Sequence, residues 1–285
     1  MRLFPIILLA NACSDDQVSQ SWQIDRMRIL AVRTSVLDEN GVPTSQAEPQ
    51  PGDSVRMASL TVHPDIEAPH IIWTGCLTDA SNLFGCPPSE VSVLGIEPFA
   101  PPSLVVPEDV LDDLSEEEKN EGLSYLFTLL AVPDIEEMDE NLDPESFSND
   151  EEIATKHMPV SLAETPNNNP FIEQILIEKN PFGPGTTLSV TPGQSYFIEP
   201  VLAFGPEEYL FINSTGGRET RTEEPYFTWY TTEGSFDLPY SEYGDAPGVN
   251  WTAPKSPLRT EVKIWVVVRD RRGGMGWAEQ SLYYK

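Results

Sequence analysis

Basic residues and histidines are scarce in this sequence. Lysine and arginine together number 17 against 46 aspartates and glutamates, and there are three histidines, so the formal net charge is −29 at pH 7. A surface this negative repels nucleic acid and anionic lipid headgroups. The charge therefore argues against a DNA- or RNA-binding role, and its ordinary consequence is solubility.

Motifs of the common enzyme classes are also missing. The sequence contains no GxSxG elbow, P-loop or Rossmann fingerprint, and His63, His70 and His157 lack the spacing of HExxH or of another metal-ligand motif. Carboxylate pairs occur throughout so acidic a chain, so they do not single out a general acid and a general base. We expect a protein without enzyme activity and without a cofactor.

No stretch of the chain is long and apolar enough to span a bilayer as a helix. The 27 prolines interrupt any long helical pattern, which favours β structure. At 285 residues the chain fits one large or two ordinary domains.

The three cysteines differ in their surroundings. Cys13 follows a short apolar stretch, whereas Cys76 and Cys86 lie close together farther along the chain. A lipid on Cys13 and a disulfide between the other two would account for all three. The alternative for Cys76 and Cys86 is a metal pair, but no histidine lies near them in sequence and their spacing fits no common zinc module.

The N-terminus has the layout of an exported lipoprotein. Met1-Arg2 is basic, 3–10 is apolar, and Ala10-Asn11-Ala12-Cys13 resembles a bacterial lipobox. Ala10 stands where leucine is usual, and the segment is shorter than the roughly 15–30 residues of most secretory signals. The alternatives are an ordinary cleaved signal or a buried N-terminal strand with a free thiol. We expect a signal peptide over 1–12, a lipid on Cys13 and a tether over 13–21, and Ser14 favours the outer membrane.

One pattern occurs twice along the rest of the chain. Each copy contains a strand, a Pro-Gly turn, a second strand and a third strand with a central tryptophan, Trp73 or Trp229. The first copy uses 24–32, 51–57 and 70–73, and the second uses 171–177, 192–198 and 226–229. Alternation of apolar side chains indicates half-buried strands at Met27, Ile29 and Ala31 and at Ile264, Val266 and Val268.

The ends of the two copies set the domain boundaries. In the second copy, 262–270 and 275–284 flank the turn Arg271–Gly274 and predict a hairpin. In the first copy, 123–132 and 157–164 would close the domain around a long acidic insertion at 133–156. The Asn- and Pro-rich stretch 165–170 is typical of a linker. The sequence thus predicts domains at 22–164 and 171–285.

These stretches resemble known families. Arg28–Arg33, Trp73-Thr74-Gly75-Cys76 and Pro166–Pro170 resemble lipoproteins common in myxobacteria and their relatives. Trp229–Gly234, Asn250–Pro254 and Trp265–Gly274 resemble PKD-like and bacterial Ig-like modules. The resemblance implies an all-β fold with two Ig-like or PKD-like β-sandwiches in tandem, and assigns no activity.

In immunoglobulin-type sandwiches a tryptophan on the third strand packs beside a disulfide that joins the two sheets. Trp73 and Trp229 occupy that place. Cys76 and Cys86 are too close in sequence to join the sheets, so their bond would staple the loop that leaves the strand of Trp73.

The acidic region contains one motif-like spacing and one helix signal. Asp139, Asn141, Asp143 and Asp150 match ligand positions of an EF-hand loop, but Pro144 stands where the turn requires glycine. A solvated loop is the main interpretation, and a calcium site is the alternative. Upstream, Ser115 and Glu118 form a capping-box pattern that predicts a helix over 112–120, with Leu111 and Leu114 facing the sandwich.

Positive charge gathers at the tip of the C-terminal hairpin, in Arg269, Arg271 and Arg272. One interpretation is a turn whose arginines pair with neighbouring acids. The other is a contact tip for an acidic partner.

The leading functional hypothesis is a non-enzymatic lipoprotein of the cell envelope, held in the membrane by its lipid, that displays sandwich domains for contact with envelope proteins or for scaffolding. The alternative is a surface module that binds calcium or glycan. Exposed rings of Tyr240, Tyr243 and Trp251 on one face would form a sugar platform, whereas burial of Trp251 favours the scaffold.

Overall fold

The computed structural model describes residues 20–78, 86–87, 89–133, 150–182, 188–212, 217–244 and 247–285. Within these ranges the chain forms one short helix and nineteen strands, so the prediction of an all-β fold is confirmed. The first half contains β1 (Arg28–Val36), β2 (Ser54–Val62), β3 (His70–Thr78), β4 (Ser92–Glu97), β5 (Ser103–Val105), α1 (Glu116–Glu121), β6 (Leu123–Val132) and β7 (Glu152–Val160).

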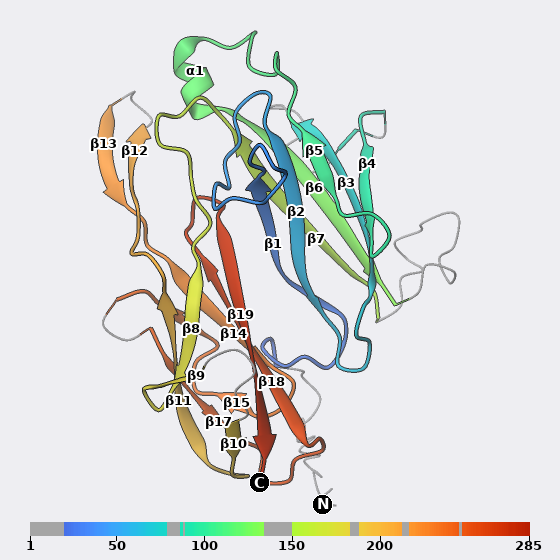
Figure 1. Ribbon diagram of the computed structural model, residues 1–285, viewed down its shortest axis with the longest axis vertical. Helices are drawn as coiled ribbons and strands as arrows, with labels where there is room; N and C mark the ends of the chain where they lie inside the picture. The colour runs from blue at the N-terminus through green and yellow to red at the C-terminus, as the bar shows by residue number, and fades with distance from the viewer. Residues whose placement is uncertain are drawn as a thin grey trace, which may run out of the picture.

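The second half is richer in short strands. It contains β8 (Ile172–Ile177), β9 (Asn180–Phe182), β10 (Leu188–Val190), β11 (Ser195–Leu202), β12 (Glu208–Ile212), β13 (Arg218–Thr222), β14 (Tyr226–Thr231), β15 (Ser235–Phe236), β16 (Tyr240–Glu242), β17 (Val249–Thr252), β18 (Glu261–Arg269) and β19 (Met275–Tyr284). In Figure 1 the first sandwich is blue to green and the second is yellow to red.

The first sandwich packs the sheet β1-β2-β5 against the sheet β4-β3-β6-β7. Its core contains Trp73 of β3, which is fully buried, with Met57, Phe127 and Met158 around it. The indole Nε1 of Trp73 donates to Oε2 of Glu97 at 3.1 Å, which satisfies the one polar atom of the ring.

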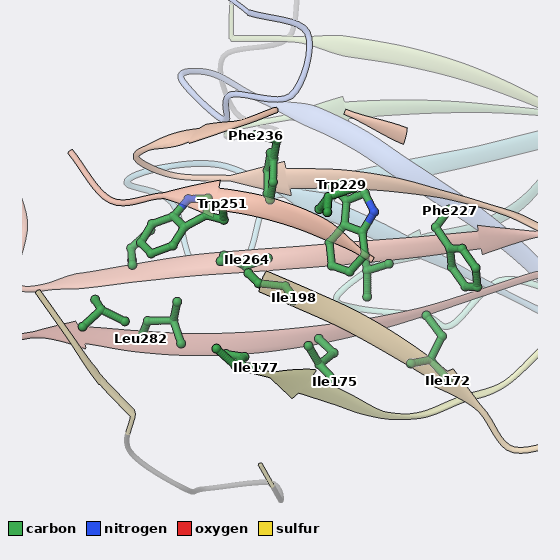
Figure 2. Close-up of a cluster of buried hydrophobic side chains, with 14 of the residues drawn as sticks. Ile172, Ile175, Ile177, Ile198, Phe227, Trp229, Phe236, Trp251, Ile264 and Leu282 are labelled. Carbon is green, nitrogen blue, oxygen red and sulfur yellow. The ribbon is translucent and has the colours of Figure 1, made fainter. Parts of the chain in front are cut away.

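The second sandwich packs the sheet β10-β19-β18-β14-β16 against the sheet β15-β17-β11-β8-β9. Figure 2 shows Trp229 and Trp251 in its core together with Ile198 and Ile264. Both tryptophans are fully buried, and their Nε1 atoms donate to Ser241 Oγ and to the backbone oxygen of Glu233, each at 3.1 Å. Strands β12 and β13 form a separate two-stranded ribbon.

Of the two closing strands of the first sandwich, β7 differs from the predicted 157–164 at both ends. β6 has the predicted bounds, but β7 begins at Glu152 instead of His157 and ends at Val160. The backbone ladder with β6 continues to the pair Ala131 and Glu152, so hydrogen bonding extends the strand into a stretch that its charges had marked as insertion. The rest of the acidic insertion lies outside the described residues, apart from its ends.

The predicted helix is confirmed in a shorter form. α1 begins at Glu116 because Ser115 is its N-cap: the Ser115 hydroxyl accepts the N–H of Glu118, and the Glu118 carboxylate accepts the N–H of Ser115. Leu111, just before the helix, is buried, and Leu114 is half-buried.

The predicted alternation along β1 fails at one residue. Met27 and Ile29 face the core of the first sandwich as expected, but Ala31 belongs to a different apolar cluster. The register with β2 shifts between Ile29 and Ala31, and such a β-bulge turns the following side chains to the other face of the sheet. Leu30 and Ala31 therefore both point away from that core.

The disulfide between Cys76 and Cys86 is present, with its Cα atoms 5.7 Å apart. It connects β3 to the segment that follows, as the spacing of the two cysteines predicted. The bond closes a short loop and leaves the two sheets unlinked.

We expect the double substitution Cys76→Ser and Cys86→Ser to lower the free energy of unfolding by about 2–3 kcal/mol, because the unfolded chain loses the constraint of a closed loop. Denaturant titration with and without a reductant measures this. Reduction should weaken the wild type by the same amount and leave the double variant unchanged. A wild type that does not respond to reductant would contradict the prediction.

Candidate functional site at the junction of the two sandwiches

β18 is buried on both of its faces. Ile264 and Val266 point into the core of the second sandwich, and Trp265 and Val267, on the opposite face, are 3% and 0% exposed. Side chains alternate between faces along a strand, so a second apolar layer must cover the Trp265 face. That layer is supplied by the first sandwich.

The two sandwiches meet through the outer faces of two sheets. Leu30 and Ala31 of β1 and Leu60 and Val62 of β2 form one buried cluster with Trp265 and Val267. At the edge of this cluster the Arg33 guanidinium lies 4.6 Å from the ring centroid of Trp277. We call this buried cluster the apolar interface.

A buried polar cluster lies beside the apolar interface, centred on Asp270 at the tip of the β18–β19 hairpin. Asp270 is 1% exposed. Its Oδ1 accepts the backbone N–H groups of Arg272, Gly273 and Gly274 at 2.7, 2.9 and 2.9 Å, and its Oδ2 accepts Asn167 Nδ2 at 2.8 Å. Four donors offset the cost of burying this carboxylate.

Glu48 extends the polar cluster into the first sandwich. Its two carboxylate oxygens accept Ser161 Oγ at 2.5 Å and the N–H of Asn167 at 2.9 Å. Arg272 lies between the sandwiches, with Glu223 of the second at 3.0 Å and Glu48 of the first at 3.9 Å. We call Glu48, Asn167, Asp270, Arg272 and Glu223 the polar joint.

Burial changes the protonation behaviour of the polar joint. Burial raises the pKa of Asp270, and the hydrogen bond from Asn167 partly opposes this rise. Burial also raises the pKa of Glu223, and the hydrogen bond from the Glu207 amide partly opposes it. Lys156 of β7 is buried beside the joint, and its Nζ donates to the backbone oxygen of Gly273. Burial lowers the pKa of Lys156 to about 8.

The predicted linker is part of this joint. Asn169 Nδ2 donates to the Thr34 oxygen in the first sandwich at 2.7 Å, and its Oδ1 accepts the N–H of Met275 in the second at 2.9 Å. A side chain at Gly274 would overlap Asp270, and one at Gly276 would overlap the backbone oxygen of Pro170. The two glycines therefore let the linker and the hairpin pack backbone against backbone.

The arginines of the hairpin tip lie against the molecule itself. Arg269 donates to the Leu30 oxygen and to Thr228 Oγ1, both at 2.7 Å, and Arg272 belongs to the polar joint. Arg271 is exposed and lies 3.4 Å from Glu242. Arg271 and Arg272 thus pair with acids, as one interpretation of the tip expects, whereas Arg269 bonds a carbonyl oxygen and a hydroxyl.

The alternative of a sugar platform made of the exposed rings of Tyr240, Tyr243 and Trp251 is wrong, because one of the three rings is buried. Trp251 is fully buried, so only Tyr240 and Tyr243 of the three rings are exposed. Burial alternates along β17, and Trp251 is one of its inward-facing residues, so its side chain fills the core.

Cys13, Asp139, Asn141 and Asp143 lie outside the described residues, so lipidation and calcium binding stay predictions. Asp150 Oδ1 lies 3.8 Å from His63 Nε2.

A cleft of about 740 Å³ opens along one side of the apolar interface. Its floor includes Leu60, Val62 and Trp265, which belong to that interface. Across it, Arg259 Nη2 of the second sandwich donates to Asp65 Oδ1 of the first at 2.9 Å. The cleft is thus the outer margin of the junction, bridged by an ion pair.

Over the described ranges, no helix has the length and apolar character needed to cross a membrane. Among the same residues, no set of three or more His, Cys, Asp or Glu side chains is arranged to hold a metal ion.

No family model and no curated protein matches this chain. Among solved structures, a nucleoside hydrolase-related hypothetical protein from Saccharophagus degradans is 11% identical over 45% of this chain, with a TM-score of 0.25, and this chain spans 34% of that one. The D0-D1 domain of intimin is 9% identical over 90% of this chain and 98% of its own (TM-score 0.22). Tandem Ig repeats of Dlar are 10% identical over 90% and 99% (TM-score 0.25). These scores are too low to support an inference about function.

Sequence reasoning missed the apolar interface and most of the polar joint. One signal was available: 264–268 is an unbroken apolar run, which is typical of a strand covered on both faces. Glu48 and Asp270 carry no such signal, because the sequence does not distinguish them from the other carboxylates of so acidic a chain.

We expect Trp265→Ala to destabilise the protein by about 3–5 kcal/mol and to loosen the two sandwiches from each other, because it removes the largest side chain of the apolar interface. Small-angle scattering under native conditions should show a wider distribution of interatomic distances. Trp251→Ala is the matched control: it empties a core within one sandwich, so stability should fall while the distance distribution stays the same. An unchanged distribution in Trp265→Ala would contradict the prediction.

We expect stability to rise between pH 7 and 9.5 because of Lys156. In the unfolded chain a lysine keeps its proton in this range, whereas the folded protein loses it through a pKa of about 8, so the charge costs stability at low pH and the cost disappears as pH rises. The rise is about 2 kcal/mol for a shift of this size. Urea titrations at both pH values should show it in the wild type and in the exposed control Lys255→Met. Its persistence in Lys156→Met would refute the assignment.

Proposed function

We propose that this protein is a non-enzymatic lipoprotein of the cell envelope that displays two Ig-like sandwiches as one stiff unit for protein contact or scaffolding. The observation that carries the proposal is the junction. Trp265 and Val267 are buried against the first sandwich, and Asn167 of the polar joint donates to Glu48 on one side of the junction and to Asp270 on the other. The buried charged groups of the polar joint therefore help to hold the two sandwiches together.

The N-terminal segment supports a particular orientation on the membrane. Before it enters the first sandwich, it pairs with β14 of the second: the N–H of Ile24 donates to the Thr231 oxygen at 2.9 Å, and the Trp22 oxygen accepts the N–H of Thr231 at 3.0 Å. Trp22 packs against the core of the second sandwich. A lipid on Cys13 would therefore hold the second sandwich nearest the membrane.

The length of the tether limits the distance from the lipid. From Cys13 to Gln20 the chain can extend about 25 Å at most, at roughly 3.3–3.6 Å for each residue. The second sandwich would stay close to the bilayer, and the first would be presented to partners. The large negative charge of the chain suits this arrangement, because anionic headgroups repel it and only the lipid attaches it.

We expect mass spectrometry of the mature N-terminus to find a diacylated Cys13, and Cys13→Ser to move the protein from the membrane to the soluble fraction. The double variant Cys76→Ser and Cys86→Ser is the control, since it also replaces cysteines, here those of the disulfide, but should stay with the membrane. A wild-type protein in the soluble fraction, with an unmodified Cys13, would rule out the anchor.

A further inference from the structure

Two phenylalanines of the second sandwich project into solvent next to each other. Phe204 is 80% exposed and Phe171 is 57% exposed. They are neighbours because the N–H of Ala203 donates to the Phe171 oxygen at 2.9 Å. Both rings line a groove of about 280 Å³ together with Leu202 and Pro206. Exposed aromatic groups gathered in a hollow are typical of contact surfaces.

The groove depends on the docking of the two sandwiches. Ser45 of the first sandwich lines it, as do Asn168 and Asn169 of the linker. Asn169 Nδ2 donates to the Ser45 oxygen at 3.1 Å, and Asn168 Nδ2 donates to Glu207 Oε1 in the second sandwich at 3.0 Å. The groove is thus formed in advance by the same junction that makes the molecule stiff, which lowers the cost of binding.

The surroundings of the groove are acidic. Glu223 and Pro225 also line an adjoining hollow, which reaches Glu224, Glu242 and the 44% exposed Tyr243. Across the two hollows the lining carries four glutamates, Glu207 among them, and one arginine, Arg271, which lies 3.4 Å from Glu242. Arg272, outside the lining, lies 3.0 Å from Glu223 and 3.9 Å from Glu207, so four carboxylates face two guanidinium groups and negative charge is in excess. Charge complementarity therefore selects a positively charged occupant.

Charge also decides between the possible kinds of occupant. A second copy of this chain carries the same net charge of −29 and is repelled. We propose that this Phe171–Phe204 groove binds an extended segment of a partner protein in which an apolar side chain lies next to lysine or arginine. The apolar side chain enters between the phenylalanines, and the basic side chains face Glu207, Glu224 and Glu242. The inference rests on the proposed function as a contact module.

Two labelled peptides of equal charge test this in solution. One has the sequence Gly-Lys-Gly-Lys-Leu-Lys-Gly-Lys-Gly, and the other has serine in place of leucine. Fluorescence anisotropy at 0.15 M salt gives both dissociation constants, and their ratio isolates the apolar contact from general attraction to an acidic protein. We expect the leucine peptide to bind about tenfold more tightly, which corresponds to about 1.4 kcal/mol.

Substitutions locate that contact. In Phe171→Ser with Phe204→Ser the ratio should fall to about one. The control is Phe99→Ser with Leu258→Ser, which removes two apolar side chains outside the groove that are 72% and 93% exposed. In this control the ratio of the two dissociation constants should stay about tenfold. A ratio near one in the wild type, or an unchanged ratio in the Phe171 and Phe204 variant, would overturn the proposal.

A third probe separates protein partners from glycans. Chitohexaose that binds the wild type and not the Phe171 and Phe204 variant would assign the groove to sugar and overturn the proposal. The membrane anchor fails or succeeds separately, because the peptide measurements use soluble protein and the state of Cys13 does not enter them.

Discussion

The central constraint on this molecule is that β18 is covered on both faces. One face builds the core of the second sandwich, and the other presents Trp265 and Val267, which pack against Leu30, Ala31, Leu60 and Val62 of the first sandwich. Separated, the second sandwich would expose these side chains as an apolar patch. Each sandwich therefore contributes to the stability of the other, and the tandem behaves as one unit whose relative geometry is set by packing.

Apolar contact supplies attraction but little direction. The polar joint supplies direction through the contacts that cross the junction: Asn167 of the linker donates to both Glu48 and Asp270, and Arg272 of the second sandwich lies 3.9 Å from Glu48 of the first. A shifted docking would break the contacts of Asp270 with Asn167, of Arg272 with Glu48 and of Lys156 with the Gly273 oxygen, and losing partners of buried charged groups is costly. Lys156 lies beside the joint, and its lowered pKa reflects the same burial.

The features that bear on function all depend on this junction. The N-terminal segment reaches the second sandwich through Thr231, and Ile24 is buried in the apolar interface. The groove at Phe171 and Phe204 takes one wall from the first sandwich and the linker. In the proposed function, a contact surface composed of two domains exists only while the domains stay docked, so the buried joint would maintain that surface.

The sequence by itself determined the features that depend on neighbouring residues. Alternation and Pro-Gly turns predicted the repeated strands, the Ser115–Glu118 pair predicted a helix, although it begins at Glu116 and not at 112, and the cysteine spacing predicted the disulfide. The tertiary structure alone decided which face each strand turns to the other domain. A bulge redirected Ala31, packing against the first sandwich buried Trp265, and the arginines of the tip found partners far away in sequence. Local patterns record whether a side chain is buried, but the identity of what buries it depends on contacts between distant segments, which no local pattern contains.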